Sequence, residues 1–275
     1  MPYDEILLQS LDDAINLGLG EFIIVGDKNL IIEKCFKLKI SSQQFIIYNI
    51  SEELYIIDFC QSMIVENKID IVIFGNISKN YHNKIICEDD KNEIGIIDVI
   101  DLPFLRHFLF VSNYSKHLNI DFDDKKKAII LADNFMRLLD IKKINVALIS
   151  NLNTKTDILE ANIIKMILRD NNYNNVNIFE TFNINTLFNK NRPVNIFSSN
   201  INLLIFRNYE ASEIFIDTLC VATQVKYAKL LVATKCYAID TLALNNTQNI
   251  LFTIMLIGKV IKKSKIKEHR EKQII

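Results

Sequence analysis

Four consecutive polar residues, Arg207-Asn208-Tyr209-Glu210, lie between an apolar run at 203–206 and an amphipathic stretch. The apolar run predicts a buried strand, and the amphipathic stretch predicts a helix. In an open parallel α/β sheet, ligands bind at the carboxyl ends of the strands. A guanidinium at such an end, beside the first amides of a helix, suits an anion such as phosphate. The alternative is structural: Asn208 and Glu210 only cap the helix, and Arg207 is a surface residue.

The elements that would position these residues follow from the hydrophobic pattern. Continuous apolar runs are typical of strands that are covered on both faces in a parallel sheet. Spacings of three and four residues between apolar positions indicate helices. Alternation of the two predicts a three-layer α/β fold. The expected strands are 21–27, 69–76, 107–113, 145–150, 202–208 and 228–234, and the expected helices are 12–19, 52–67, 123–140, 155–170 and 211–223.

Length and composition limit the class of protein. A chain of 275 residues with 49% hydrophobic residues can form one large domain or two small ones around a sizeable core. Its net charge of −1 gives no support for a nucleic-acid partner. The longest apolar window, 250–258, is far shorter than the roughly 20 residues of a membrane helix, and the acidic N-terminus lacks the bases of an export signal. We therefore expect a cytoplasmic protein with no membrane partner. Residues 261–273 are rich in bases and predict a helical end.

The usual signatures of metal and nucleotide sites are missing from the sequence. The five cysteines form no C-x-x-C pair and the four histidines are scattered, so we expect reduced thiols and no metal site. The glycines at 18–26 precede a strand, whereas a dinucleotide-binding motif needs them after one. A P-loop, a nucleophile elbow and an H-E-x-x-H motif are also lacking. Dehydrogenase and zinc-hydrolase functions are therefore not favoured.

Polar or glycine residues stand at the ends of four of the expected strands, at Gly26-Asp27, Gly75-Asn76, Ser112-Asn113 and 207–210. With the residues around them, these strand ends resemble the phosphate acetyl/butyryltransferase family, and the shorter phosphate butyryltransferase branch in particular. The order and spacing of the segments agree from about residue 6 to residue 260. The matching segments are IVGD at 24–27, IDIVIFG at 69–75, FVSN at 110–113, LLDIKKINVALIS at 138–150 and INLLIFRNYEASE at 201–213.

The chain departs from the family pattern at residues that carry chemistry. The family's Lys-Gly is Phe74-Gly75 here, its Thr/Ser-Asp is Ser112-Asn113, and its P-N-I-E-A-G-N has Arg207 in place of proline. The family's T-S-R-x-D is matched only by TLALN at 241–245.

In the family, the serine and arginine of that last motif contact the substrate, and its aspartate is the base for the CoA thiol. Asn245 stands at the position of the base, and an amide cannot accept that proton. Ala243 stands at the position of the arginine and cannot bind phosphate. A thiol is partly ionised at neutral pH, so turnover can survive the loss of the base. Asp240 could substitute for it, although an exposed or capping role is more common for such a residue.

The resemblance implies a three-layer α/β/α fold with a mostly parallel sheet and two lobes flanking a cleft, as in isocitrate and isopropylmalate dehydrogenases. The first lobe would comprise 1–112 and 236–275. The second would comprise 113–235 and form a homodimer.

The implied reaction converts acyl-CoA and phosphate into acyl phosphate and CoA, with an acetyl or butyryl group and no covalently bound cofactor or metal. The alternatives are a catalytically inactive family member that acts as a binding or partner protein, and the related acyl-phosphate synthase of phospholipid synthesis. The candidate catalytic positions are Thr241 and Asn245. The candidate substrate-binding residues are Gly75, Ser112, Asn113, Arg207, Asn208, Glu210 and Thr234.

Overall fold

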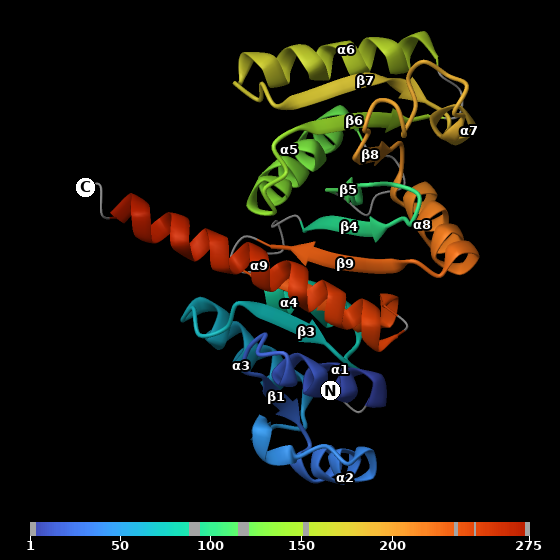
Figure 1. The fold of residues 1–275 in the computed structure, drawn as a ribbon. Helices are drawn as coiled ribbons and strands as arrows, with labels where there is room; N and C mark the ends of the chain where they lie inside the picture. The colour runs from blue at the N-terminus through green and yellow to red at the C-terminus, as the bar shows by residue number, and fades with distance from the viewer. Residues whose placement is uncertain are drawn as a thin grey trace. The chain divides into compact units, whose positions relative to one another are not determined.

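The computed structural model describes residues 4–87, 94–114, 121–150, 154–233, 236–244 and 246–272. The chain, traced in Figure 1, forms two compact units: Met1–Ile94 with Ala228–Ile275, and Gly95–Tyr227. The boundaries expected from the sequence, after residues 112 and 235, lie further along the chain than these. Strand β4 (Gly95–Asp101) accounts for part of the difference, because it pairs antiparallel with β5 (Leu109–Asn113) and lies with it in the second unit.

The first unit combines helices with two small groups of strands. Strand β1 pairs parallel with β2, and β3 pairs parallel with β10, which also pairs antiparallel with β9. Helices α1 and α9 lie side by side, as Figure 1 shows. The elements are α1 (Glu5–Asn16), β1 (Ile23–Gly26), α2 (Lys28–Leu38), η1 (Ser42–Gln44), β2 (Ile46–Asn49), α3 (Glu53–Val65), β3 (Ile71–Phe74), η2 (Lys79–Tyr81), α4 (His82–Ile86), β9 (Lys226–Val232, whose first two residues belong to the second unit), β10 (Tyr237–Asp240), η3 (Thr241–Ala243) and α9 (Thr247–Lys272).

Local capping decides where two of these helices begin. The sequence predicts a helix at 12–19, but α1 starts seven residues earlier because the Asp4 side chain accepts a hydrogen bond from Ile6 N. The Asp27 side chain accepts from Asn29 N and Leu30 N and starts α2, a helix that the sequence pattern did not predict. The Gly26-Asp27 strand end is thus occupied by a helix cap.

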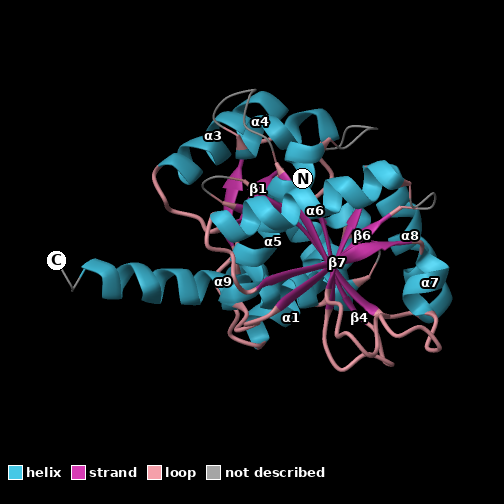
Figure 2. Ribbon diagram, turned by 90° about the horizontal axis from the view of Figure 1, so that it is seen from above, coloured by secondary structure: helices cyan, strands magenta, loops and turns pink. Residues whose placement is uncertain are grey.

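The second unit contains a mixed sheet with helices on both faces. Strand order within it is β4-β5-β8-β6-β7, and all pairs are parallel except β4 with β5. Figure 2, which looks onto this unit from β7, shows the strands fanned by the sheet twist. Besides β4 and β5, the elements are α5 (Phe122–Leu138), β6 (Ile144–Ile149), α6 (Lys155–Asp170), β7 (Val176–Phe182), α7 (Ile184–Phe188), β8 (Leu203–Phe206) and α8 (Tyr209–Thr223).

Two neighbouring residues of β5 identify the layers of this unit. The Ser112 hydroxyl donates to the carbonyl oxygen of Ala128 in α5, whereas the Asn113 amide donates to Ser212 in α8. Successive side chains of a strand point to opposite faces of the sheet, so α5 and α8 cover opposite faces. Helix α6 lies with α5, because Lys125 of α5 forms a salt bridge of 2.7 Å with Glu160 of α6. The expected three-layer α/β/α arrangement with a mostly parallel sheet is confirmed.

Candidate functional site

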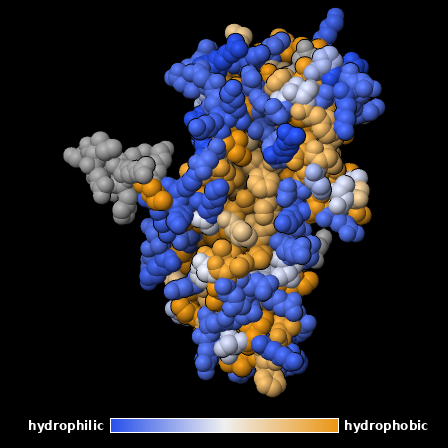
Figure 3. Space-filling view, viewed as in Figure 1, coloured by the Kyte–Doolittle hydropathy of each residue, from blue (hydrophilic) through white to orange (hydrophobic). Residues whose placement is uncertain are grey.

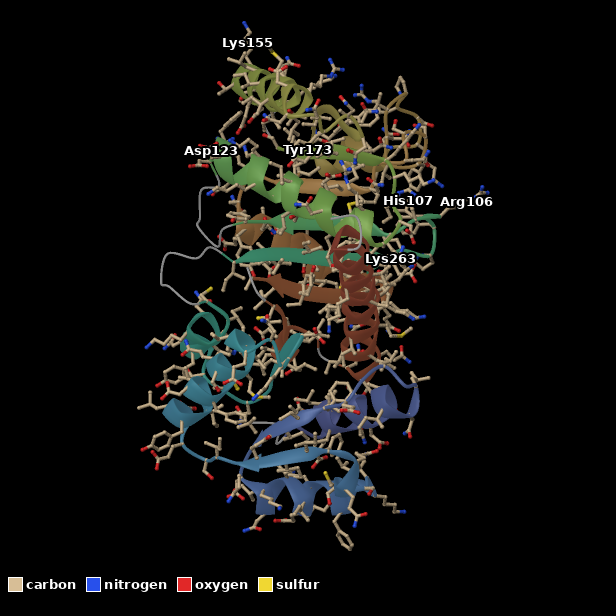
Figure 4. The ribbon with its side chains drawn as sticks, turned by 90° about the vertical axis from the view of Figure 1, so that its left-hand side faces the viewer. Arg106, His107, Asp123, Lys155, Tyr173 and Lys263 are labelled. Atoms are coloured by element: carbon tan, nitrogen blue, oxygen red, sulfur yellow. The ribbon has the colours of Figure 1, made fainter. Side chains whose placement is uncertain are left out.

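The carboxyl ends of β5, β8 and β6 lie next to one another at one edge of the second unit. Phe206 is paired with Ile149 in the parallel register, and continuing the register of β5 and β8 places Asn113 beside Phe206. Arg207 and Ser150 are the next residues of β8 and β6. Figure 4 shows Lys155 of α6 and Asp123 of α5 on the same side of the unit, opposite Arg106 and His107, which precede β5.

The connections that follow these three strands lead to helices on opposite faces of the sheet. From β5 and β6 the chain continues to α5 and α6 on one face of the sheet, and from β8 it continues to α8 on the other. Strand β8 is therefore flanked by neighbours whose following helices lie on the opposite face. In open α/β sheets, ligands bind outside the strand ends at such a switch point.

Residues 207–210 occupy the centre of this switch point. The Asn208 side chain accepts a hydrogen bond of 2.7 Å from Ala211 N, so this candidate substrate-binding residue has the capping role that was considered as the alternative. Glu210 is exposed in the first turn of α8, where a negative charge interacts favourably with the helix dipole. Arg207 is exposed at the end of β8, so its guanidinium is accessible to an anion.

A hydrogen-bonded carboxylate that the sequence analysis did not single out lies beside Arg207. Asp157 Oδ2 accepts hydrogen bonds from Ser150 Oγ at 3.0 Å and from Thr154 N and Oγ1, both at 2.8 Å. Burial opposes ionisation of this group, but these hydrogen bonds and the charge of Arg207 outweigh it and lower the pKa of Asp157. The T-x-x-D spacing of Thr154 and Asp157 is a capping-box signal from which this carboxylate could have been found.

Asn113 lies on the other side of β8, under the first turn of α8. Its Nδ2 donates to Ser212 Oγ at 3.1 Å, and Ser212 Oγ donates to Tyr209 O at 2.6 Å. The residue is 1% exposed, and its Oδ1 has no hydrogen-bond partner among the residues that the structure describes. The other candidate of this strand, Ser112, faces α5, where its hydroxyl is engaged by the carbonyl of Ala128.

The candidates of the first unit lie around β3 and β10. Thr241 Oγ1 donates to Phe74 O at 2.7 Å, and Gly75 follows directly as a buried residue. The Asp240 side chain caps η3 by accepting from Leu242 N, so the capping role considered for it is the one observed. Asn245 and Thr234 lie outside the described residues. The two sets of candidate residues belong to different units. The switch-point residues are in the second unit, and the residues around β3 and β10 are in the first.

The described residues contain no group of three or more His, Cys, Asp or Glu side chains that could hold a metal ion. The five cysteines, all of which the structure describes, form no disulfide bond. Burial raises the pKa of Cys60 to about 11, so this thiol is not an activated nucleophile. Within the described part of the chain, we find no helix with enough apolar length to span a membrane.

The chain is a mixed α/β protein. Its second unit has a topological switch point, the kind of place at which α/β proteins bind ligands. Comparison with solved structures relates the fold to particular proteins. A branched-chain phosphotransacylase from Enterococcus faecalis is 12% identical with a TM-score of 0.76, over 94% of this chain and 96% of that one. A phosphotransacetylase from Streptococcus pyogenes is 12% identical with a TM-score of 0.69, over 94% and 92%.

The same fold also occurs in a dehydrogenase. A 4-hydroxythreonine-4-phosphate dehydrogenase from Klebsiella pneumoniae is 10% identical with a TM-score of 0.63, over 93% of this chain and 94% of that one. No protein-family model matches the chain, and no curated protein matches it. At these identities the likeness establishes the fold, which phosphotransacylases and 4-hydroxythreonine-4-phosphate dehydrogenases share.

Proposed function

We propose that this chain is a phosphate acyltransferase, which converts acyl-CoA and inorganic phosphate into acyl phosphate and CoA. The observation that carries the proposal is the position of Arg207 at the switch point of the second unit, beside the first turn of α8. A guanidinium and the N-terminal end of a helix together form an anion-binding arrangement. The similarity to phosphotransacylases over nearly the whole chain supports the same function.

The reaction requires few groups from the protein. A phosphate oxygen attacks the thioester carbonyl, the carbon–sulfur bond breaks, and the CoA thiol leaves with a proton. The enzyme must hold the phosphate, stabilise the negative charge on the carbonyl oxygen and help to transfer the proton. In this proposal Arg207 and the α8 N-terminus hold the phosphate, and acyl-CoA is a substrate with no separate cofactor. Acetyl and butyryl groups are the acyl chains to test first.

A catalytically inactive binding or partner protein is the second candidate, and a specific substitution favours it. Ala243, at the end of η3, has only a methyl group at the position where the phosphate acetyl/butyryltransferase family has an arginine. Asn245 stands at the position of the aspartate that is the base in that family. Loss of one well-placed polar group typically lowers kcat about 10²–10³-fold. We therefore expect turnover, if it is present, to be much slower than in an intact phosphotransacylase.

Helix α6 supports a homodimer as part of the proposal. Leu159, Ile163 and Met166 are 59%, 40% and 64% exposed and lie on one face, at the spacing of a helical stripe. In Figure 3 hydrophobic areas interrupt the otherwise hydrophilic surface along this helix. A second copy that packs against this stripe would remove it from water. A cytoplasmic location would suit a protein with acyl-CoA as its substrate.

The decisive experiment measures CoA thiol release from acetyl-CoA and butyryl-CoA with and without phosphate. The expected result is a slow, phosphate-dependent release that Arg207→Ala reduces and Arg106→Ala, on the opposite edge, leaves unchanged. Absence of release together with CoA binding by calorimetry would favour the inactive binding protein. Absence of both release and binding would contradict both candidates.

A further inference from the structure

Arg207 and Asp157 lie on the same face of the sheet of the second unit. Phe206 of β8 is in register with Ile149 of β6, so continuing this register places Arg207 beside Ser150. Residues in register on neighbouring strands point to the same face of a sheet. Ser150 points toward α6, because its hydroxyl donates to Asp157 Oδ2 at 3.0 Å. The Arg207 side chain therefore leaves the end of β8 on the face where Asp157 lies.

The carboxylate of Asp157 is held in place as a negative charge. Asp157 is 8% exposed, and its Oδ2 accepts hydrogen bonds from Ser150 Oγ and from N and Oγ1 of Thr154. These bonds prevent the carboxylate from turning away from a ligand. Burial opposes its ionisation, but the hydrogen bonds and the charge of Arg207 outweigh burial and lower its pKa. An anion bound nearby would thus meet a charge that neither moves away nor takes up a proton at neutral pH.

The charge of Asp157 acts on Arg207 without a direct contact. In the described part of the chain, no hydrogen bond or salt bridge joins the two side chains. The carboxylate therefore does not fix the guanidinium in one orientation, whereas the Coulomb interaction between charges extends well beyond hydrogen-bond distance. An anion that binds to Arg207 is attracted by the guanidinium and repelled by Asp157.

Building on the proposed function, we infer that Asp157 is a specificity-determining residue that limits the negative charge of the anion bound at Arg207. The repulsion by one fixed carboxylate grows in proportion to the charge of the anion. Pyrophosphate carries more negative charge than inorganic phosphate, so Asp157 repels it more strongly. The site therefore takes inorganic phosphate and disfavours polyphosphates.

The test compares the dissociation constants of phosphate for the wild-type chain and for Asp157→Asn, by calorimetry at pH 8 and low ionic strength. Asparagine retains an oxygen that accepts hydrogen bonds but has no charge. We expect Asp157→Asn to bind phosphate about three- to ten-fold more tightly, and pyrophosphate to gain by a larger factor. Both gains should shrink at high salt, because salt screens charges near the surface. A structural defect would weaken binding, so it cannot imitate this result.

Asp217→Asn is the matched control. It makes the same change in net charge on the exposed side of α8, which covers the other face of the sheet. This variant should bind phosphate and pyrophosphate as the wild type does. If it tightens binding as much as Asp157→Asn, the effect comes from the net charge of the chain and the inference is wrong.

The outcomes separate this inference from the proposed function. If the wild type binds phosphate and Asp157→Asn binds it equally well or more weakly, the inference is wrong while the phosphate site stands. If neither chain binds phosphate, the phosphate site of the proposed function is wrong and the inference falls with it. If Asp157→Asn folds poorly, the wild type decides: it should bind pyrophosphate no more tightly than phosphate, and tighter binding of pyrophosphate would overturn the inference.

Discussion

Tyr227 Oη donates a hydrogen bond of 2.6 Å to Asp98 Oδ1. Both residues are buried, and they are 129 positions apart in the sequence. Asp98 is opposite Val111 of β5, so it shares with Asn113 the face of the sheet that α8 covers. Burial, together with the charge of Asp98, raises the pKa of Tyr227 well above its ordinary value. This contact ties the start of β9 to β4 inside the second unit.

We predict that Tyr227→Phe lowers the free energy of unfolding by about 2 kcal/mol, because it removes the donor to a buried carboxylate. Urea unfolding at pH 7 measures this change. The pKa of Tyr227 is raised in the folded state, so this contribution is present below the unfolded pKa of about 10 and is lost as the pH rises above it. Tyr55→Phe is the control, because Tyr55 is 60% exposed. An equal loss in both variants would contradict the prediction.

Removal of the Arg207 side chain should weaken the binding of phosphate or CoA at least several-fold without a large loss of stability, because Arg207 is exposed. Calorimetry on Arg207→Ala measures the affinity. Arg106→Ala removes an exposed arginine from the opposite edge and should bind as the wild type does. Unchanged binding in Arg207→Ala would show that Arg207 is a surface residue with no role in binding the anion.

Asp157→Ala should reduce the free energy of unfolding by about 2 kcal/mol at pH 7, because it removes the acceptor of the capping box and of Ser150. The pKa of Asp157 is lowered in the folded state, so its contribution is present above the unfolded pKa of about 3.9. It is lost as the pH falls through the lower folded pKa. The difference between variant and wild type should therefore shrink in acid, and Asp217→Ala, on the exposed face of α8, serves as the control.

The double change Ala243→Arg with Asn245→Asp should raise phosphate-dependent CoA release at least about ten-fold if both positions face the substrate. Each single change should raise the rate of CoA release only slightly, because the effects of residues that act together in catalysis are strongly non-additive. The single variants are therefore the matched controls in the same assay. Fast turnover by the unmodified chain would instead show that the missing residues are not needed.

Charges placed on the apolar stripe of α6 should prevent self-association. We predict that Leu159→Glu with Met166→Glu gives a monomer in sedimentation equilibrium, while the wild type is a dimer. The control, Phe36→Glu, alters a residue of α2 that is 83% exposed and should leave the dimer intact. A monomeric wild type would rule out the homodimer.

The sequence by itself determined the kind of fold and most of its elements. Continuous apolar runs such as 145–150 and 203–206 predicted β6 and β8, and helical spacing predicted α5, α6 and α8 with small errors at their ends. These features depend on neighbours along the chain and on burial, both of which a sequence pattern records. Elements without a clear pattern were not predicted. They include the short β2 and α7 and the longer α2, β4 and β7.

The tertiary structure alone decided which polar residues share a site. The sequence could not indicate that Asn113 faces α8 while Ser112 faces α5, because a shift of one position in the strand exchanges the two. It also gave no sign that Ser150 and Asp157 lie beside Arg207, since the pairing of β6 with β8 joins segments more than fifty residues apart. Long-range strand order places these side chains together, and only the folded chain contains that information.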